Sequence, residues 1–286
     1  MGSIELVIAP RRRSIGRDEV DRLLPYRERR MVGPFVYADL IGPDRLAPGV
    51  GIDVPVHPHI GLATVTYLFD GALVHRDSTG AVQRIEPGGV NWMTAGAGVA
   101  HSERSPDDER AADSTIAGLQ TWVALPAEAE EAPPSFQHVP VADVPSFELG
   151  DAHVRLLAGH LAGKHSPTQV ASPLYHCDVQ FDAAGVATVD EEHRERGVLV
   201  IDGDVSVAGR KIAPRHLAVL APGGAAEIRT AGAARVVSFG GARVGDRTIV
   251  WNFVGSTRER IDRAAAAWRA GDWPPVPGDD EIVPMP

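Results

Sequence analysis

The sequence predicts an all-β protein built from a duplicated antiparallel barrel unit and completed by one short C-terminal helix. The 30 glycines and 23 prolines among 286 residues follow no collagen-like period, which is typical of many short strands joined by tight turns. Runs rich in β-branched and aromatic residues recur between these turn signals. Turn motifs of the first half also return in the second half, which indicates two similar β-domains.

The first half begins with expected strands at Ile4–Ala9 and Met31–Leu40. The run TVTYLF at Thr64–Phe69 has the composition of a strand, and Asp70-Gly71 supplies a turn that returns the chain as Ala72–His75. These residues predict a hairpin. Further strands between turn residues are expected at Val82–Ile85, Val90–Met93, Val99–Glu103 and Ile116–Leu125.

The acidic, proline-rich stretch Pro126–Pro134 is expected to link the two halves. It divides the chain into a domain at residues 1–134 and a domain at residues 135–286. The second domain, like the first, consists of short candidate strands between turn residues. Its candidate strands are Gln137–Val141, Val154–Gly159, Tyr175–Phe181, Val198–Ile201, Val205–Val207, Leu217–Leu220 and Arg235–Phe239.

Three turn motifs carry the inference of a duplicated unit. Each occurs at a similar spacing in both halves: LFDG, EPGG and TAG at 68–71, 86–89 and 94–96 are echoed by VIDG, APGG and TAG at 200–203, 221–224 and 230–232. Self-similarity of this kind is the sequence signature of a repeated structural unit.

The stretch Ser256–Ala270 predicts a helix near the C-terminus. A serine or threonine stands at the N-cap position, apolar residues follow at helical spacing, and the interior contains no glycine or proline. Gly271 and Pro274-Pro275 end the helix.

Charge and cysteine content restrict the possible partners and compartments. The net charge of −10 argues against a surface that binds nucleic acid directly. Cys177 is the only cysteine, so an intramolecular disulfide is excluded and a reducing compartment suits the fold. No apolar run is long enough for a membrane span or a signal peptide. We therefore expect a cytoplasmic protein without a membrane partner.

Two pairs of side chains predict a metal site. Residues two apart in a strand point to the same face with Cα atoms about 6.5 Å apart, so His57 and His59 project together, and so do His101 and Glu103. The pairs are far apart in the sequence, so only a sheet that folds back on itself can join them. Three imidazoles and one carboxylate suit iron, copper, nickel, manganese or zinc. A lone histidine is more often a surface or core residue, but four candidates in two pairs favour a metal.

Other histidines do not show this pairing. His75 lies on the return strand of the hairpin, where it is expected to donate a hydrogen bond behind the ligands or to line the rim. In the second half, the positions equivalent to His57 and His59, counted back from the shared glycine turn, are Val189 and Glu191. The second domain is therefore expected to lack a metal, with the segment 190–195 as a solvated acidic loop.

The spacing of these motifs resembles the cupin superfamily, with HxH before a glycine turn and another histidine further along. Cupins commonly place a glutamate ligand where this chain has Ala63, so the carboxylate must be Glu103. That relocation, with HPHIGLATVTYL, WMTAGAGVAHSER, LQTWVALP and the C-terminal IVWNFVGSTRERIDRAAAAWRAGDWPP, resembles the pirin family of bicupins. The likeness covers nearly the whole chain. It departs at Ile60 and Ala97, where many relatives have arginine.

The resemblance implies two stacked antiparallel β-barrels of the cupin, or jelly-roll, type. One divalent metal, iron by first expectation, is held in residues 1–134 by His57, His59, His101 and Glu103; nickel, copper, manganese and zinc are alternatives. Residues 135–286 form a metal-free cupin domain that includes the helix and tail.

For function, the resemblance implies a quercetin 2,3-dioxygenase-like enzyme that opens a flavonol or another small phenolic substrate with O2. The resemblance implies that Glu103 is a metal ligand and the catalytic base, with a group behind the ligands as the alternative base. The alternative is a metal- or redox-responsive regulator that binds a protein partner, such as a transcriptional co-regulator, without turnover. A third possibility is another cupin reaction, such as isomerisation or hydrolysis, with a redox-inert metal.

Overall fold

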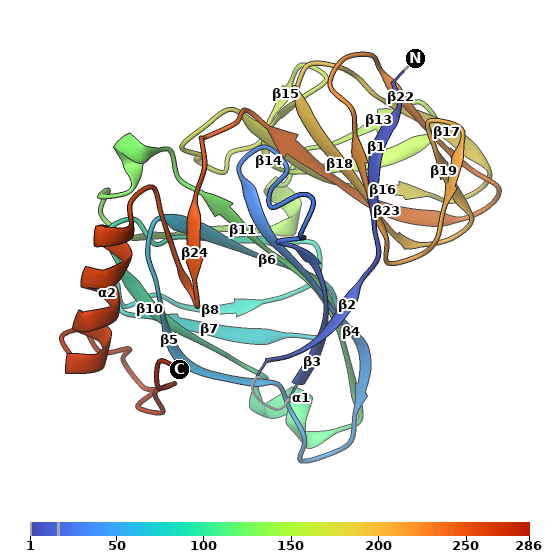
Figure 1. Ribbon diagram of the computed structural model, residues 1–286. Helices are drawn as coiled ribbons and strands as arrows, with labels where there is room; N and C mark the ends of the chain where they lie inside the picture. The colour runs from blue at the N-terminus through green and yellow to red at the C-terminus, as the bar shows by residue number, and fades with distance from the viewer. Residues whose placement is uncertain (1, 16–17) are drawn as a thin grey trace. The chain divides into compact units, whose positions relative to one another are not determined.

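The computed structural model describes residues 2–15 and 18–286, which consist mainly of β-strands (Figure 1). The contacts of the chain divide it into two compact units. We name each after the half of the chain that supplies most of it. The first unit comprises residues 12–20, 39–142 and 244–286, and the second unit comprises residues 1–11, 21–38 and 143–243.

These units differ from the expected domains, which divide the chain once at residue 134. Residues 244–286, expected in the second domain, make their contacts within the first unit, and residues 21–38 make theirs within the second. The domains at 1–134 and 135–286 stay a prediction, because compact units are defined by contacts and domains by independent folding.

Two main sheets form the first unit. The larger has the order β12-β9-β6-β11-β4-β3-β2, and the smaller has the order β5-β10-β7-β8. The larger sheet contains β2 (Arg11–Ile15), β3 (Asp18–Leu24), β4 (Phe35–Leu46), β6 (Leu62–Asp70), β9 (Val90–Thr94), β11 (Ser114–Ala124) and β12 (Ser135–Val139), and residues of β2, β3 and β4 are divided between the units. The smaller contains β5 (Asp53–His59), β7 (Leu73–Asp77), β8 (Val82–Ile85) and β10 (Val99–Arg104).

Two sheets also form the second unit, with orders β1-β21-β18-β23-β16-β14-β13 and β17-β22-β19-β20; β15 pairs with β14. The larger contains β1 (Ile4–Ile8), β13 (Ser146–Leu149), β14 (Ala152–Leu161), β15 (Lys164–His165), β16 (Leu174–Phe181), β18 (Glu195–Asp202), β21 (Leu217–Leu220) and β23 (Ala234–Gly241). The smaller contains β17 (Gly185–Val189), β19 (Val205–Val207), β20 (Arg210–Ile212) and β22 (Ala226–Thr230).

A larger and a smaller sheet in each unit is the arrangement of a jelly roll, so the all-β expectation with two jelly-roll units is confirmed. The sheets form sandwiches and not closed barrels. The remaining elements are the short helix α1 (Asp107–Ala111), the 3₁₀ turns η1 (Ala127–Ala129) and η2 (Val141–Asp143), the hairpin β24 (Thr248–Val250) and β25 (Phe253–Gly255), and helix α2 (Arg258–Ala270).

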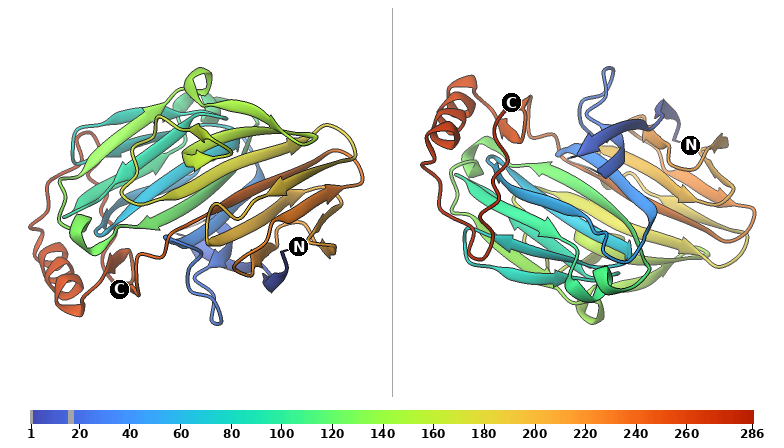
Figure 2. Two further views of the ribbon diagram at one scale, coloured as in Figure 1. Left: turned by 90° about the horizontal axis from the view of Figure 1, so that it is seen from above. Right: turned by 90° about the horizontal axis from the view of Figure 1, so that it is seen from below.

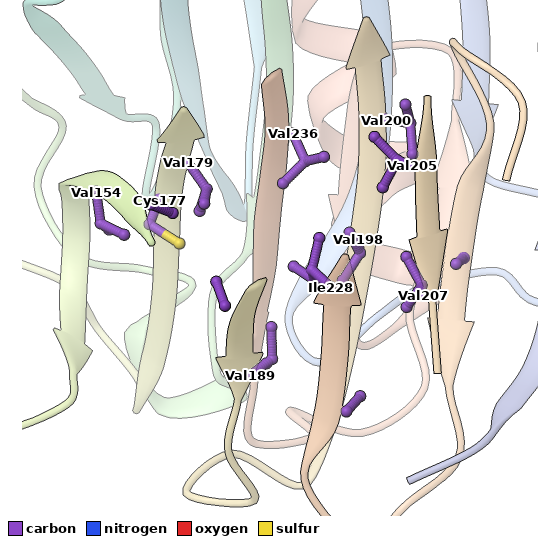
Figure 3. Close-up of a cluster of buried hydrophobic side chains, with 14 of the residues drawn as sticks. Val154, Cys177, Val179, Val189, Val198, Val200, Val205, Val207, Ile228 and Val236 are labelled. Atoms are coloured by element: carbon purple, nitrogen blue, oxygen red, sulfur yellow. The ribbon is translucent and has the colours of Figure 1, made fainter. Parts of the chain in front are cut away.

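Apolar side chains fill the interior of the second unit, as Figure 3 shows. Val198 and Val200 of β18 alternate with residues of the other face, and Val205 and Val207 of β19 do the same. Cys177 lies in this core, 1% exposed, and burial raises the pKa of its thiol. The thiol therefore serves as a small apolar group.

Helix α2 confirms the helix expected near the C-terminus. Thr257 is the N-cap, and its side chain accepts a hydrogen bond from the Arg260 backbone N–H. Gly271 ends the helix with a φ of 74°. The buried face of α2 packs in one cluster with the outer face of β5 and its flanks, and Figure 2 shows α2, in red, beside the first unit's blue and green strands. This cluster contains Val56, Ile60, Ala100, Phe253, Ile261, Ala265, Trp268 and Val276.

The acidic stretch expected as a linker packs within the first unit. Glu130 is 2% exposed, and it accepts a hydrogen bond from the Ser256 hydroxyl at 2.9 Å. Arg247 lies 3.1 Å from the Glu130 carboxylate, and Arg260 donates to the Glu130 backbone carbonyl. These contacts anchor the start of α2.

The segment 190–195 is not solvated throughout, contrary to expectation. Its last residue, Glu195, is 2% exposed, and its carboxylate accepts a hydrogen bond from the Gly33 backbone N–H at 2.7 Å. Arg29 lies 3.2 Å from the same carboxylate. His193 is also buried.

Across the described residues, every helix is too short or too polar to span a membrane.

His176 is a buried imidazole in the second unit. It lies on β16 with 0% exposure, and neither ring nitrogen has a hydrogen-bond partner among the described residues. The rings of Phe35 and Phe239 lie 5.4 Å and 6.0 Å from its ring. Burial lowers the pKa of His176 to about 3, so the ring stays neutral in the folded protein.

We predict that His176 makes the second unit sensitive to acid. Between pH 6.5 and about 3 the unfolded chain protonates this ring and the folded chain does not, so stability falls as pH falls. The slope for one such group is about 1.4 kcal/mol per pH unit. The stability of His176→Leu relative to the natural chain should therefore rise from pH 7 to pH 5 in urea unfolding followed by far-UV circular dichroism. The control is His153→Leu, at a half-exposed histidine of β14. A profile of His176→Leu parallel to that of the natural chain would refute the prediction.

Candidate metal centre

Two neighbouring strands bring three histidines together in the first unit. Strands β5 and β10 pair antiparallel, with His57 opposite His101. The ring centroid of His101 lies 4.3 Å from that of His57 and 5.0 Å from that of His59. All three side chains are buried, and one ring nitrogen from each lies within 4.8 Å of the others. The two pairs thus lie side by side in one sheet, and do not face each other across the unit.

Glu103 lies on the same strand, beyond a register shift between His101 and Glu103. It forms a second group with His75 and His101, whose ligand atoms also lie within 4.8 Å of one another. Its two carboxylate oxygens accept hydrogen bonds from the Thr66 hydroxyl at 2.8 Å and the Gln120 amide at 3.0 Å. Thr66 and Gln120 are cross-strand partners in β6 and β11, so the carboxylate is held between the two sheets.

Backbone carbonyls set the tautomers of His57 and His59. The Nδ1 atom of His57 lies 2.8 Å from the Pro55 carbonyl oxygen, and that of His59 lies 3.0 Å from the Asn252 carbonyl oxygen. Because a carbonyl oxygen only accepts, each Nδ1 carries the hydrogen and the lone pair of each neutral ring is on Nε2. Ligating histidines are commonly oriented by this type of contact.

The Asn252 carbonyl is supplied by the turn between β24 and β25, which lies close to the end of β5. Val254 donates its N–H to the Ile60 carbonyl at 3.2 Å. Gly61 has a φ of +66°, and a Cβ atom there would lie 2.1 Å from the Val254 carbonyl oxygen. A glycine is therefore required at this position for the turn to reach His59.

His75 and Asp77 orient His101. The Nε2 atom of His75 lies 2.9 Å from the Asp77 carboxylate, and its Nδ1 lies 3.3 Å from the Nδ1 of His101. Burial alone would raise the pKa of Asp77, but hydrogen bonds from His75 and Thr79 leave it lowered. The ionised carboxylate takes the Nε2 hydrogen of His75, whose Nδ1 then accepts from His101.

His101 is therefore left with a lone pair on Nε2. That atom is buried and has no hydrogen-bond partner among the described residues. An orphaned buried nitrogen beside two other imidazoles is the feature expected where a metal ion binds. Three neutral Nε2 atoms and a nearby carboxylate fit a divalent transition metal.

Desolvation keeps these rings neutral. Burial lowers the pKa of His57 and lowers the pKa of His59 and His101 well below 6.5, and the neighbouring imidazoles lower them further. At neutral pH their lone pairs are thus available to a metal without loss of a proton.

Sequence reasoning left His75 either behind the ligands or at the rim, and the structure buries it against His101. It missed Asp77, although HRD repeats the same-face spacing of HPH and HSE. It also missed Thr66, Gln120 and Asn252, which come from distant segments. Ile60, by contrast, lies on the face opposite His59, beneath α2.

Two family models match the chain. Residues 16–123 match the model described as Pirin, and residues 176–274 match the Pirin C-terminal cupin domain.

Known proteins are similar over most of the chain. A pirin-like protein of Caulobacter vibrioides is 42% identical over 99% of both chains. Human pirin is 31% identical over 76% of this chain and 70% of its own. A crystal structure of quercetin 2,3-dioxygenase from Acinetobacter baumannii has a TM-score of 0.89 and 30% identity, covering 98% of this chain and 96% of that one.

We predict that loss of one imidazole or of its supporting carboxylate weakens metal binding at this centre. His101→Ala should abolish stoichiometric iron binding, and Asp77→Asn should weaken it about 10-fold to 100-fold because the His75 contact loses its charge. Metal analysis after equilibrium dialysis measures both effects. The control is His138→Ala, which removes a partly buried histidine outside the cluster. Full iron content in His101→Ala would exclude the ring as a ligand.

We also predict the direction of the pH dependence. Protons compete for the same lone pairs, and the lowered histidine pKa values move this competition to lower pH. Bound metal should be retained as pH falls through 6.5 and be released only below it, as the buried rings protonate. Metal content after chelator challenge from pH 7.5 to 4 measures the midpoint. Release centred at or above pH 6.5 would contradict the prediction.

Proposed function

The chain belongs to the pirin family, and from this premise we propose that it is a metal-dependent dioxygenase that opens the central ring of a flavonol such as quercetin. The observation that carries the proposal is a group of three imidazoles that shares His101 with a second group, which contains the Glu103 carboxylate. The similarity to quercetin 2,3-dioxygenase from Acinetobacter baumannii supports the substrate class.

In this proposal His57, His59, His101 and Glu103 hold one divalent ion. Iron is the first candidate, and nickel, copper, manganese and zinc accept the same donor set. The ion supplies a Lewis-acid centre and a path for electrons between flavonol and dioxygen.

The protein's own part is to remove one proton and to hold the reacting groups in place. Glu103 accepts the proton of the flavonol 3-hydroxyl, which converts the substrate to its oxidisable anion. Thr66 and Gln120 fix the carboxylate, so that its orientation is set before the substrate arrives. His75 and Asp77 hold His101 in the tautomer with Nε2 free.

The reaction balances without another reactant. One flavonol and one dioxygen give one ring-opened ester and one carbon monoxide. Both atoms of dioxygen enter the ester, and the carbon monoxide takes C3 of the flavonol with its own oxygen. The electrons come from the flavonol, which is oxidised as dioxygen is reduced. The proton held by Glu103 returns to the product.

We predict oxygen-dependent turnover of quercetin. Iron-loaded protein should bind quercetin without oxygen, with a shift of its absorbance, and should consume it with release of equimolar carbon monoxide when oxygen enters. Glu103→Gln should lower kcat about 10²-fold to 10⁴-fold, as expected for loss of a general base. Glu259→Gln, an exposed change on α2, is the matched control.

Absence of turnover by fully metal-loaded protein would exclude this function. The metal- or redox-responsive interaction protein would then be favoured, and pull-downs with metal-loaded and metal-free protein would test it. A partner that binds both forms equally would exclude a metal switch.

A further inference from the structure

The second unit contains a different cluster of metal-ligating side chains, outside its apolar interior. His160 lies near the end of β14, and Glu192 and His193 lie in the turn before β18. One ligand atom from each of the three lies within 4.8 Å of the others. We propose that His160, Glu192 and His193 form a second site for a divalent transition metal such as Zn²⁺. The proposal does not rest on the proposed dioxygenase activity.

His193 has the environment of an oriented ligand. It is 4% exposed, and its ring packs against those of His160 and Tyr175 at 4.6 Å and 4.8 Å. Its Nε2 donates to the His160 carbonyl at 2.9 Å, so the neutral ring keeps its lone pair on Nδ1. Burial lowers the pKa of His193, which maintains the neutral form at pH 7.

Glu192 and His160 have the spacing of two ligands on one ion. The Glu192 Oε1 atom lies 3.3 Å from the His160 Nε2 atom. Two atoms at about 2.0–2.2 Å from a tetrahedral zinc ion are about 3.3–3.6 Å apart. The second carboxylate oxygen accepts a hydrogen bond from the Ala162 N–H at 3.2 Å, which orients the group.

A simple ion pair explains the cluster less well. The side chains of His160 and Glu192 are 32% and 33% exposed, and a pair so exposed contributes little to stability. It also does not involve His193, the third member of the group. Three protein ligands and a partly exposed position for water are the usual composition of an open zinc site.

The same strand offers a natural control. His153 of β14 also pairs with a glutamate, with its Nδ1 3.0 Å from the Glu148 carboxylate. No third histidine, cysteine or carboxylate joins that pair in the groups found among the described residues. If a His–Glu pair alone were enough to bind metal, the His153–Glu148 pair would bind it as well as the His160–Glu192 pair.

The test titrates Zn²⁺ into full-length, metal-free protein by isothermal calorimetry. The His57→Ala, His101→Ala double variant disables the first centre, and it should still bind one equivalent. Adding His160→Ala, His193→Ala or Glu192→Gln to this background should weaken that binding at least about 10-fold. Adding His153→Ala should leave it unchanged.

Folding is checked by circular dichroism. His193 is buried, so His193→Ala could fail to fold. In that case the changes at the partly exposed residues, His160→Ala and Glu192→Gln, test the proposal. No binding by the double variant would overturn the proposal, and so would binding that survives both His160→Ala and Glu192→Gln.

Discussion

The pairing of β5 with β10 is the constraint on which the site of the first unit depends. Its register places His57 opposite His101, and a shift by one residue would turn both side chains to the other face of the sheet. That other face is itself committed, because Val56 and Ile60 pack beneath α2. Both faces of β5 are buried, so each face independently requires the same register with β10. The same register brings β7 beside β10, with Asp77 opposite His101 and His75 opposite Glu103.

The two units share one architecture but differ in the side chains that fill their interiors. The second unit fills its interior with apolar groups, whose burial stabilises the fold without any demand for hydrogen bonds. The first unit buries imidazoles and carboxylates, and each such group costs free energy unless it is paired. The carbonyls of Pro55 and Asn252 and the side chains of Thr66 and Gln120 supply those partners. Among these described groups, the Nε2 atom of His101 remains without a hydrogen-bond partner, and a metal would use it.

The sequence predicted what depends on local periodicity. A repeat of two along a strand placed His57 with His59 and His101 with Glu103, and capping and spacing located α2. The helper residues were not predicted, because a carbonyl such as that of Asn252 has no chemical signature in the sequence and reaches His59 only through the fold. The sequence also did not predict that each compact unit is assembled from distant segments of the chain, because contacts between distant segments leave no local pattern. Glu192 and His193 were not predicted as a site, because adjacent residues do not form a same-face pair on a strand.

The Asn252 carbonyl has a consequence for how such a chain can evolve. A duplicated barrel suggests two modules that a gene could separate or exchange. Yet the β24–β25 turn, α2 and the tail, where Val283 hydrogen-bonds to Val56, all come from the end of the chain and complete the first unit. Residues from the end of the chain therefore complete the unit that contains His57, His59 and His101. A gene that encoded only residues 1–142 would contain the histidines but lack the Asn252 carbonyl that orients His59.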